Sequence, residues 1–206
     1  VDEQSGNSVS LSSDGSIVAI GSSLNSGSGM NGSGQVRVFN YNGDSWTQLG
    51  DAIYGEGEWD AMGVHKSISL SSDGSVIAIG SLGNDATPAI RNSGHVRVYE
   101  FSDNSWTQLG DNIDGDNQFD RFGYGVTLSG SGSIVAISAP YGIATGGNVL
   151  GGYVRIYSYD GENWLQFGSD IGGERGGDRI GLNEEGKVVY NLQYKADEAY
   201  SPITSV

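Results

Sequence analysis

The sequence predicts an all-β protein, and two observations carry that prediction. A unit of about sixty residues recurs three times, and each copy contains four short runs rich in β-forming residues. No segment of ten or more residues places its apolar residues at helical spacing. Glycine, serine and proline make up about a third of the 206 residues. Because they recur in register with the unit, they indicate turns between strands rather than a disordered chain.

A tight turn joins the first two runs of each unit. In the first unit, the runs at residues 8–11 and 17–20 flank a turn that contains Gly15. Gly74 and Gly132 hold the same place in the second and third units, and aspartate precedes the glycine in the first two. Glycine readily adopts the positive φ angle that hairpin turns require. The pattern therefore predicts an antiparallel strand pair at the start of each unit.

Each unit closes with a strand that contains a tryptophan, and the run before it carries an arginine between apolar neighbours. The repeated residues are Trp46, Trp106 and Trp164, and Arg37, Arg97 and Arg155. The tryptophans are 60 and 58 residues apart. We therefore expect four antiparallel strands in each unit.

Four strands in about sixty residues match a β-propeller blade, because a solenoid coil takes only roughly 20–30 residues. We expect a single β-propeller-like repeat domain over residues 1–206. Its blades fall at about residues 5–58, 59–118 and 119–176, with a partial blade at 177–206.

The last unit is reduced: it has a first hairpin around Gly186 but no tryptophan strand. Open blade edges can be completed in a small closed ring, by pairing of two copies, or in a filament. The missing strand favours completion between copies. The start of the sequence within the first strand region also suggests a piece of a longer chain.

Composition disfavours several classes of partner. Ten lysine and arginine residues against 25 aspartate and glutamate residues give a formal net charge of −15. Such a chain is repelled by nucleic-acid phosphates and by anionic membrane surfaces. No apolar run approaches the roughly 18 residues that span a bilayer. Cysteine is absent, which removes disulfides, thiolate metal sites and cysteine nucleophiles.

The repeat resembles a degenerate FG-GAP repeat, the unit of the propeller of integrin α chains. The resemblance rests on Phe122-Gly123 followed by the Ser-Ala-Pro of residues 138–140, and on the recurring W-T-Q-L-G and S-x-S-L-S-S-D-G patterns. The resemblance covers roughly residues 1–190. The recurring pattern is similar to that of a branch of such repeats common in secreted proteins of marine microbes and algae. It implies an extracellular protein with a propeller fold. The calcium loop of integrin-type blades is cut too short here to supply six to eight oxygen ligands.

A second set of acidic residues lies in the connections between units. The set between the second and third units is Asp111, Asp114, Asp116 and Asp120; related positions are Asp51, Glu56, Glu58 and Asp60, and Asp170, Glu174 and Asp178. These residues predict either a calcium site that bridges two blades or a solvated acidic loop. The spacing is not that of a calcium loop, which favours the solvated loop.

The repeated aromatic and basic residues also have two interpretations each. The strand tryptophans either stack on sugars or, as is more usual for a repeated aromatic, pack against the next blade. The arginines either bind an anion or pair with nearby carboxylates. Trp59 lies outside the repeated strand position and is the better candidate for a ligand contact. Asn31 begins an Asn-Gly-Ser sequence that is a candidate N-glycosylation site.

No constellation of catalytic residues is apparent. The two histidines, His65 and His95, lie in different strands and suggest neither a zinc site nor a nucleophilic triad. We expect a non-enzymatic extracellular protein with a structural or adhesive role, which self-associates through its open blade edges. The alternative is a module that binds glycans or calcium through its inter-blade loops. Apart from calcium we expect no cofactor, and other extracellular proteins are further candidate partners.

Overall fold

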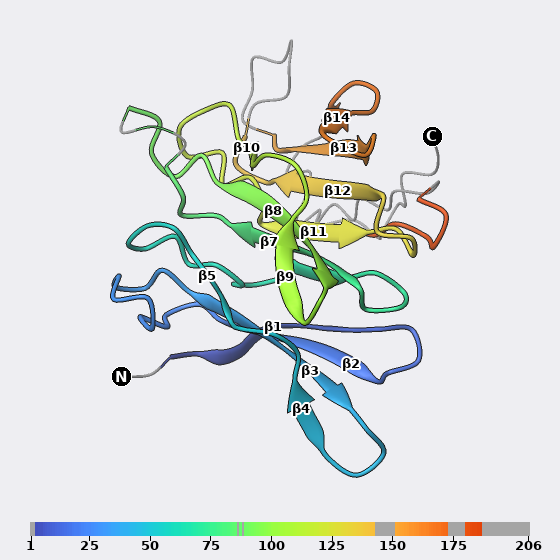
Figure 1. The fold of residues 1–206 in the computed structure, drawn as a ribbon. Helices are drawn as coiled ribbons and strands as arrows, with labels where there is room; N and C mark the ends of the chain where they lie inside the picture. Colours follow the sequence, from blue (N-terminus) through green and yellow to red (C-terminus); the bar gives the residue numbers. More distant parts are fainter. Residues whose placement is uncertain (1–2, 86, 88, 143–150, 173–179, 187–206) are drawn as a thin grey trace, which may run out of the picture.

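The computed structural model describes residues 3–85, 87, 89–142, 151–172 and 180–186, and it places the strands in three antiparallel sheets (Figure 1). We call these sheets blades 1, 2 and 3. Blade 1 comprises β1 (Ser5–Leu11), β2 (Ile17–Ser22), β3 (Gln35–Tyr41), β4 (Trp46–Gln48) and β5 (Ile53–Tyr54). Blade 2 comprises β6 (Ile68–Leu70), β7 (Val76–Ser81), β8 (His95–Ser102), β9 (Ser105–Gln108) and β10 (Ile113–Asp114). Blade 3 comprises β11 (Gly125–Leu128), β12 (Ile134–Ala139), β13 (Tyr153–Tyr159), β14 (Trp164–Gln166) and β15 (Ile171–Gly172).

The first hairpin of each blade forms where the sequence predicts it. In blade 1 the turn between β1 and β2 has Gly15 at a φ of 73°, and the Gly15 amide donates to the Ser12 carbonyl. The Asp14 carboxylate accepts hydrogen bonds from the Ser16 amide and the Ser12 hydroxyl. These bonds lower the pKa of Asp14 to about 2. Asp73 makes the same contacts in blade 2, so the repeated Ser-Asp-Gly sequence forms the same hydrogen-bonded turn in both blades.

The fourth strand of each blade is divided in two. In blade 1, β4 pairs with the end of β3 and β5 pairs with its beginning. Gly50 lies between the two pieces at a φ of 62°. The sequence predicts four strands per unit, and the structure confirms this number of strand positions with an interruption in the outermost one.

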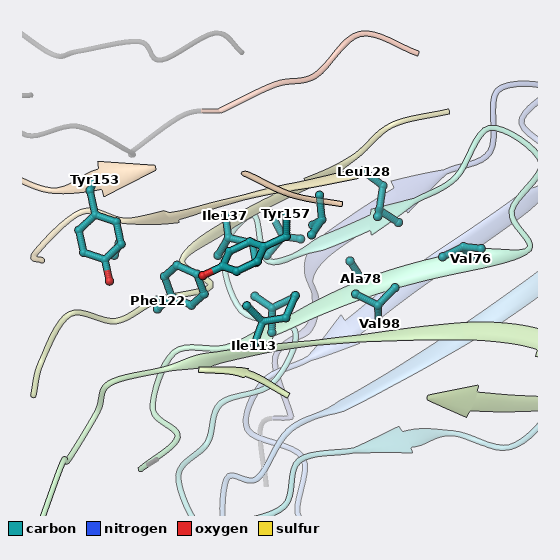
Figure 2. Close-up of a cluster of buried hydrophobic side chains, with 13 residues drawn as sticks. Val76, Ala78, Val98, Ile113, Phe122, Leu128, Ile137, Tyr153 and Tyr157 are labelled. Atoms are coloured by element: carbon teal, nitrogen blue, oxygen red, sulfur yellow. The ribbon is translucent and has the colours of Figure 1, made fainter. Parts of the chain in front are cut away.

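Side chains between neighbouring blades form the core. One buried cluster joins blades 1 and 2, and a second joins blades 2 and 3. Figure 2 shows the second cluster, in which Val98 and Ile113 of blade 2 lie opposite Phe122 and Tyr157. Every residue of β7 is buried because the middle blade is covered on both faces. One sheet therefore depends on its neighbours to bury its apolar surface.

Glycine permits the close approach of consecutive blades. Gly34 and Gly94 precede β3 and β8 at φ angles of 84° and 75°. A Cβ atom on Gly34 would overlap the Met62 backbone, and one on Gly94 would overlap the Phe122 backbone. Both positions need the left-handed conformation and the absence of a side chain, so the recurring glycine fixes the spacing between blades.

Backbone hydrogen bonds link the hairpin turns of successive units. The Ser13 amide donates to the Ser72 carbonyl at 2.9 Å, and the Ser72 amide donates to the Gly130 carbonyl at 2.9 Å. The Gly130 amide donates to the Glu184 carbonyl at 2.8 Å, so the described part of the fourth unit continues the series. The other residues of the predicted partial blade, 177–179 and 187–206, lie outside the described residues. No helix in the described part of the chain is long and apolar enough to cross a membrane.

Candidate functional site

The repeated tryptophans contact the blade that precedes them. The Trp106 indole N–H donates to the Leu49 carbonyl of blade 1 at 3.0 Å, and the Trp164 indole N–H donates to the Leu109 carbonyl of blade 2 at 2.9 Å. Both rings also join the buried clusters between blades. These two tryptophans therefore pack between blades, although against the preceding blade rather than the next one.

Trp46 differs from the other two because no described blade precedes it. Its side chain is 48% exposed. Its ring rests on Tyr41 with 5.2 Å between ring centroids, as the other two rest on the aromatic residue at the same strand position. The ring is thus held in the same place as in blades 2 and 3, with its outer surface uncovered.

Arg97 and Arg155 each pair with a carboxylate from the preceding connection, and Arg155 also pairs with Asp170, which follows β14. Arg97 lies 3.2 Å from the Glu56 carboxylate and donates to the Tyr54 carbonyl at 2.7 Å. Arg155 lies 2.6 Å from Asp116 and 2.8 Å from Asp170. Burial by itself would lower the pKa of Arg155, but the hydrogen bonds to these carboxylates raise it above its ordinary value. For these two arginines, the carboxylate-pairing interpretation is confirmed.

Arg37 has no such carboxylate among the described residues. Its guanidinium lies 5.6 Å from the centre of the Phe39 ring, as the Arg97 guanidinium lies over Tyr99. The Nε atom of Arg37 is buried and has no hydrogen-bond partner in the described part of the chain, and the same holds for the Nε atom of Arg97, so only the missing carboxylate distinguishes Arg37. The arginine of blade 1 therefore occupies its repeat position without the partner that its counterparts have.

The four aspartates that the sequence offers as a calcium site or a solvated loop make separate contacts. Asp116 pairs with Arg155, and the buried Asp120 accepts a hydrogen bond from the Tyr153 hydroxyl at 2.9 Å. Asp114 faces His95, and Asp111 is exposed on the surface. Across the described ranges, no group of three or more histidine, aspartate or glutamate side chains is placed to hold a metal ion. Glu174 and Asp178, at the related positions after blade 3, lie outside those ranges.

Asp60 and Asp120 anchor the connections between blades. The Asp60 carboxylate accepts hydrogen bonds from the Glu56 and Gly57 amides at 2.9 and 2.8 Å and from the Asn84 amide group of blade 2 at 3.3 Å. Burial raises the pKa of both aspartates. Sequence reasoning placed them among acidic loop residues. Their separation of 60 residues, equal to that of Trp46 and Trp106, marks them as repeated positions, but the exposed Asp51 and Asp111 have the same separation and it does not reveal burial.

His95 lies buried where blade 1 meets blade 2. Neither ring nitrogen has a hydrogen-bond partner among the described residues, and Nδ1 is 3.9 Å from carboxylate oxygens of both Glu56 and Asp114. Burial, aided by the charge of Arg97, lowers the pKa of His95 to about 3. The imidazole is therefore neutral near pH 7.

Trp59 lies outside the repeated strand position, in the loop between blades 1 and 2, and this loop position has a counterpart in the next unit. Phe119 occupies the equivalent place before a buried aspartate, and the two side chains are 63% and 54% exposed. The Trp59 amide donates to the Asn31 carbonyl and the Phe119 amide to the Arg91 carbonyl, at 2.8 and 2.9 Å. Both inter-blade loops thus present an aromatic side chain to solvent. The Asn31 side chain is exposed beside this loop, where its amide donates to Glu58 at 3.4 Å.

The described residues leave one face of blade 1 uncovered. Val9 and Leu11 are 54% and 57% exposed, whereas their counterparts in blade 2, Ile68 and Leu70, are 6% and 7% exposed. The register of the first hairpins establishes the equivalence, because Val9 pairs with Ile20 as Ile68 pairs with Ile79. We call the surface formed by Val9, Leu11, Arg37, Phe39 and Trp46 the free face of blade 1.

The comparisons with known proteins bear on the fold alone. No protein-family model matches the sequence, and no curated protein matches it. The structure is similar to TolB from Acinetobacter baumannii, with a TM-score of 0.53, 9% identity, and coverage of 95% of this chain and 39% of that one. It is also similar to a candidate 6-phosphogluconolactonase from Bacteroides uniformis, with a TM-score of 0.54, 14% identity, and coverage of 95% and 52%.

A protein of unknown function from Desulfotomaculum acetoxidans has a TM-score of 0.51 and 13% identity, and the match covers 96% of this chain and 55% of that one. TolB and the lactonase are β-propellers. The predicted fold class, all-β with propeller-type blades of four antiparallel strands, is therefore confirmed. The chain spans about half the length, or less, of these solved structures.

Proposed function

We propose that this chain is a non-enzymatic extracellular repeat protein with a structural or adhesive role, which assembles by packing its open blade faces against further blades. The observation that carries the proposal is the free face of blade 1. Its residues are those that blades 2 and 3 bury at their contacts with the preceding blade. A solvent-exposed surface with the composition of an interior interface is typical of an association site.

The use of the repeated polar residues supports a structural role over a catalytic one. Arg97 and Arg155 are paired with carboxylates, and the Trp106 and Trp164 indoles donate to backbone carbonyls. These residues stabilise contacts between blades. The extracellular assignment rests on the resemblance to FG-GAP-like repeats of secreted proteins.

Sedimentation velocity of the full chain, from about 1 µM to about 500 µM, tests the proposal because association follows mass action. We expect the mean sedimentation coefficient to rise with concentration, and negative-stain electron microscopy to resolve closed pairs or short filaments. A species that remains monomeric over the whole range would contradict self-assembly.

A second candidate function is glycan binding, and the exposed side chains of Trp59 and Phe119 favour it. Aromatic side chains with one exposed surface stack on the apolar faces of other molecules. A glycan array probed with the full chain and with Trp59→Ala tests this candidate, and Leu165→Ala, at an exposed apolar side chain of β14, serves as a control outside the inter-blade loops. Binding lost only in Trp59→Ala supports it, and the absence of binding by the unmodified chain refutes it. Calorimetric titration with calcium tests whether the inter-blade loops bind calcium.

A further inference from the structure

We infer that an exposed cluster of aromatic and basic side chains, at the point where the two connections between blades meet, binds a sugar that carries a carboxylate group. The members of this cluster, which we call the aromatic–arginine cluster, are His65, Arg121, Tyr124 and Tyr141. The inference goes beyond the functions proposed above, because it requires no association between copies and uses neither exposed aromatic side chain of the glycan-binding candidate.

Three separate segments of the chain supply the cluster. His65 belongs to the connection between blades 1 and 2, Arg121 and Tyr124 belong to the connection between blades 2 and 3, and Tyr141 follows β12. The His65 ring stacks on the Tyr124 ring with 4.9 Å between centroids, and the Tyr124 ring meets the Tyr141 ring edge to face at 6.4 Å. The Arg121 guanidinium lies 5.0 Å from the centre of the Tyr141 ring. Side chains that are far apart in the sequence thus form one continuous surface.

The backbone holds these segments in place. The Val126 amide donates to the Lys66 carbonyl at 3.0 Å, which joins the two connections, and the Tyr124 amide donates to the Arg121 carbonyl at 3.2 Å. His65 and Arg121 have φ angles of 56° and 54°, a left-handed conformation that is uncommon for residues other than glycine. The surrounding structure must impose this conformation, and strain of this kind is typical of sites that hold a ligand.

The cluster is open to solvent and carries polar groups beside its rings. The Tyr141 side chain is 52% exposed, and His65 and Arg121 are exposed as well. Partial burial, aided by the charge of Arg121, lowers the pKa of His65, so its imidazole is neutral near pH 7 and offers one donor and one acceptor. Aromatic rings with polar groups at their edges match a sugar, which presents both apolar C–H faces and hydroxyl groups.

Arg121 determines the charge of the ligand. Among the described residues, the lysine and arginine side chains that are exposed and lack an ion pair are Lys66, Arg91 and Arg121. Arg97 and Arg155, by contrast, pair with carboxylates in this acidic chain. Of the three exposed side chains, Arg121 is the one that rests on an aromatic ring, which orders its guanidinium and leaves the in-plane N–H donors available. An ordered guanidinium binds a carboxylate through two parallel hydrogen bonds.

Titration of the full chain, followed by ligand-observed NMR with sodium D-glucuronate as the probe, tests the inference. Salt at about 0.15 M screens the net negative charge of the chain beyond roughly 8 Å, so the local contact dominates the result. D-Glucose supplies the sugar ring without the carboxylate, and sodium acetate supplies the carboxylate without the sugar ring. Adenosine monophosphate supplies an aromatic ring with a phosphate.

Three variants identify the site. Arg121→Gln removes the guanidinium, and Tyr141→Ala removes the ring on which it rests. Arg91→Gln is the matched control, because Arg91 is also an exposed arginine without an ion pair in the described part of the chain. All three side chains are exposed, so none of these substitutions opens a cavity in the core.

We expect the unmodified chain to bind glucuronate more tightly than glucose, acetate or adenosine monophosphate. Arg121→Gln should weaken glucuronate binding by roughly tenfold or more, the loss typical of a charge-assisted hydrogen bond. Tyr141→Ala should weaken it as well, and Arg91→Gln should leave it unchanged.

Four results would overturn the inference. These are no binding of glucuronate, equal weakening by Arg91→Gln and Arg121→Gln, a probe other than glucuronate that binds as tightly, and a loss of binding in Trp59→Ala alone, which would assign the sugar to the other candidate site. None of them alters the sedimentation expected of the unmodified chain, so failure here leaves the proposed self-assembly standing, and a monomeric chain leaves this site standing.

Discussion

Burial of His95 makes the stability of the contact between blades 1 and 2 dependent on pH. The charged groups that face this imidazole are Glu56 from the connection, Asp114 from β10 and Arg97 from β8. Burial lowers the pKa of His95 from 6.5 to about 3 in the folded chain. As pH falls below 6.5, the unfolded chain binds a proton on this side chain and the folded chain does not, so stability is lost.

The magnitude follows from the two pKa values. Between pH 7 and pH 5, preferential protonation of the unfolded chain costs about 2 kcal/mol of unfolding free energy. Buried carboxylates contribute with the opposite sign, because a raised pKa in the folded chain favours folding at lower pH. The variant His95→Gln removes the histidine contribution and leaves those carboxylates in place. Glutamine is a conservative choice because Gln35 occupies the equivalent position in blade 1.

Urea unfolding followed by circular dichroism at pH 7, 6 and 5 measures the effect. We expect the unmodified chain to lose about 2 kcal/mol more than His95→Gln over this range. If the two proteins show parallel dependence on pH, the imidazole takes up its proton in the folded chain. That result would contradict the burial of a neutral His95 side chain between Glu56, Asp114 and Arg97.

Two further changes test the contacts between blades. Trp106→Phe should cost about 1 kcal/mol of unfolding free energy, measured by urea unfolding, because the partly buried hydrogen bond to the Leu49 carbonyl is lost. Trp46→Phe should cost less than about half of that, because no described blade precedes Trp46. Gly94→Ala should cost roughly 3 kcal/mol or more, because its Cβ would overlap the Phe122 backbone at a φ of 75°. Gly161→Ala, which has positive φ and open space around it, should cost distinctly less; equal losses would refute the spacing role.

Local structure was the more predictable part of this molecule. The Ser-Asp-Gly turns produce hairpins because the aspartate and glycine act within four or five residues of chain, as Asp14 and Gly15 do. The four strand positions per unit were also predictable, because the strands and the turns between them are set by short local stretches of sequence. The division of the outer strand at Gly50 was not predicted, because glycine after a strand is equally consistent with an ordinary strand end.

Contacts between blades were less predictable, because they depend on the relative placement of sheets. Repetition indicated that the tryptophans pack on a neighbouring blade but not which neighbour, and the hydrogen bond from Trp106 to Leu49 identifies the preceding one. Composition placed Asp60 and Asp120 in solvated loops, whereas both are buried anchors. The sequence likewise contains no local signal that His95 is buried, since a histidine in a short strand lies on either face with similar ease.

The relative reactivity of the three strand tryptophans shows whether one face of blade 1 is open to solvent. Hydroxyl-radical footprinting with mass spectrometry, on the full chain at about 1 µM where association is least, measures each side chain within one molecule. An open series of blades predicts that Trp46 reacts several-fold faster than Trp106 and Trp164, because only the latter two are covered by a preceding blade. Equal protection of all three would mean that blade 1 is already covered within the chain, and it would contradict the free face on which the proposed assembly depends.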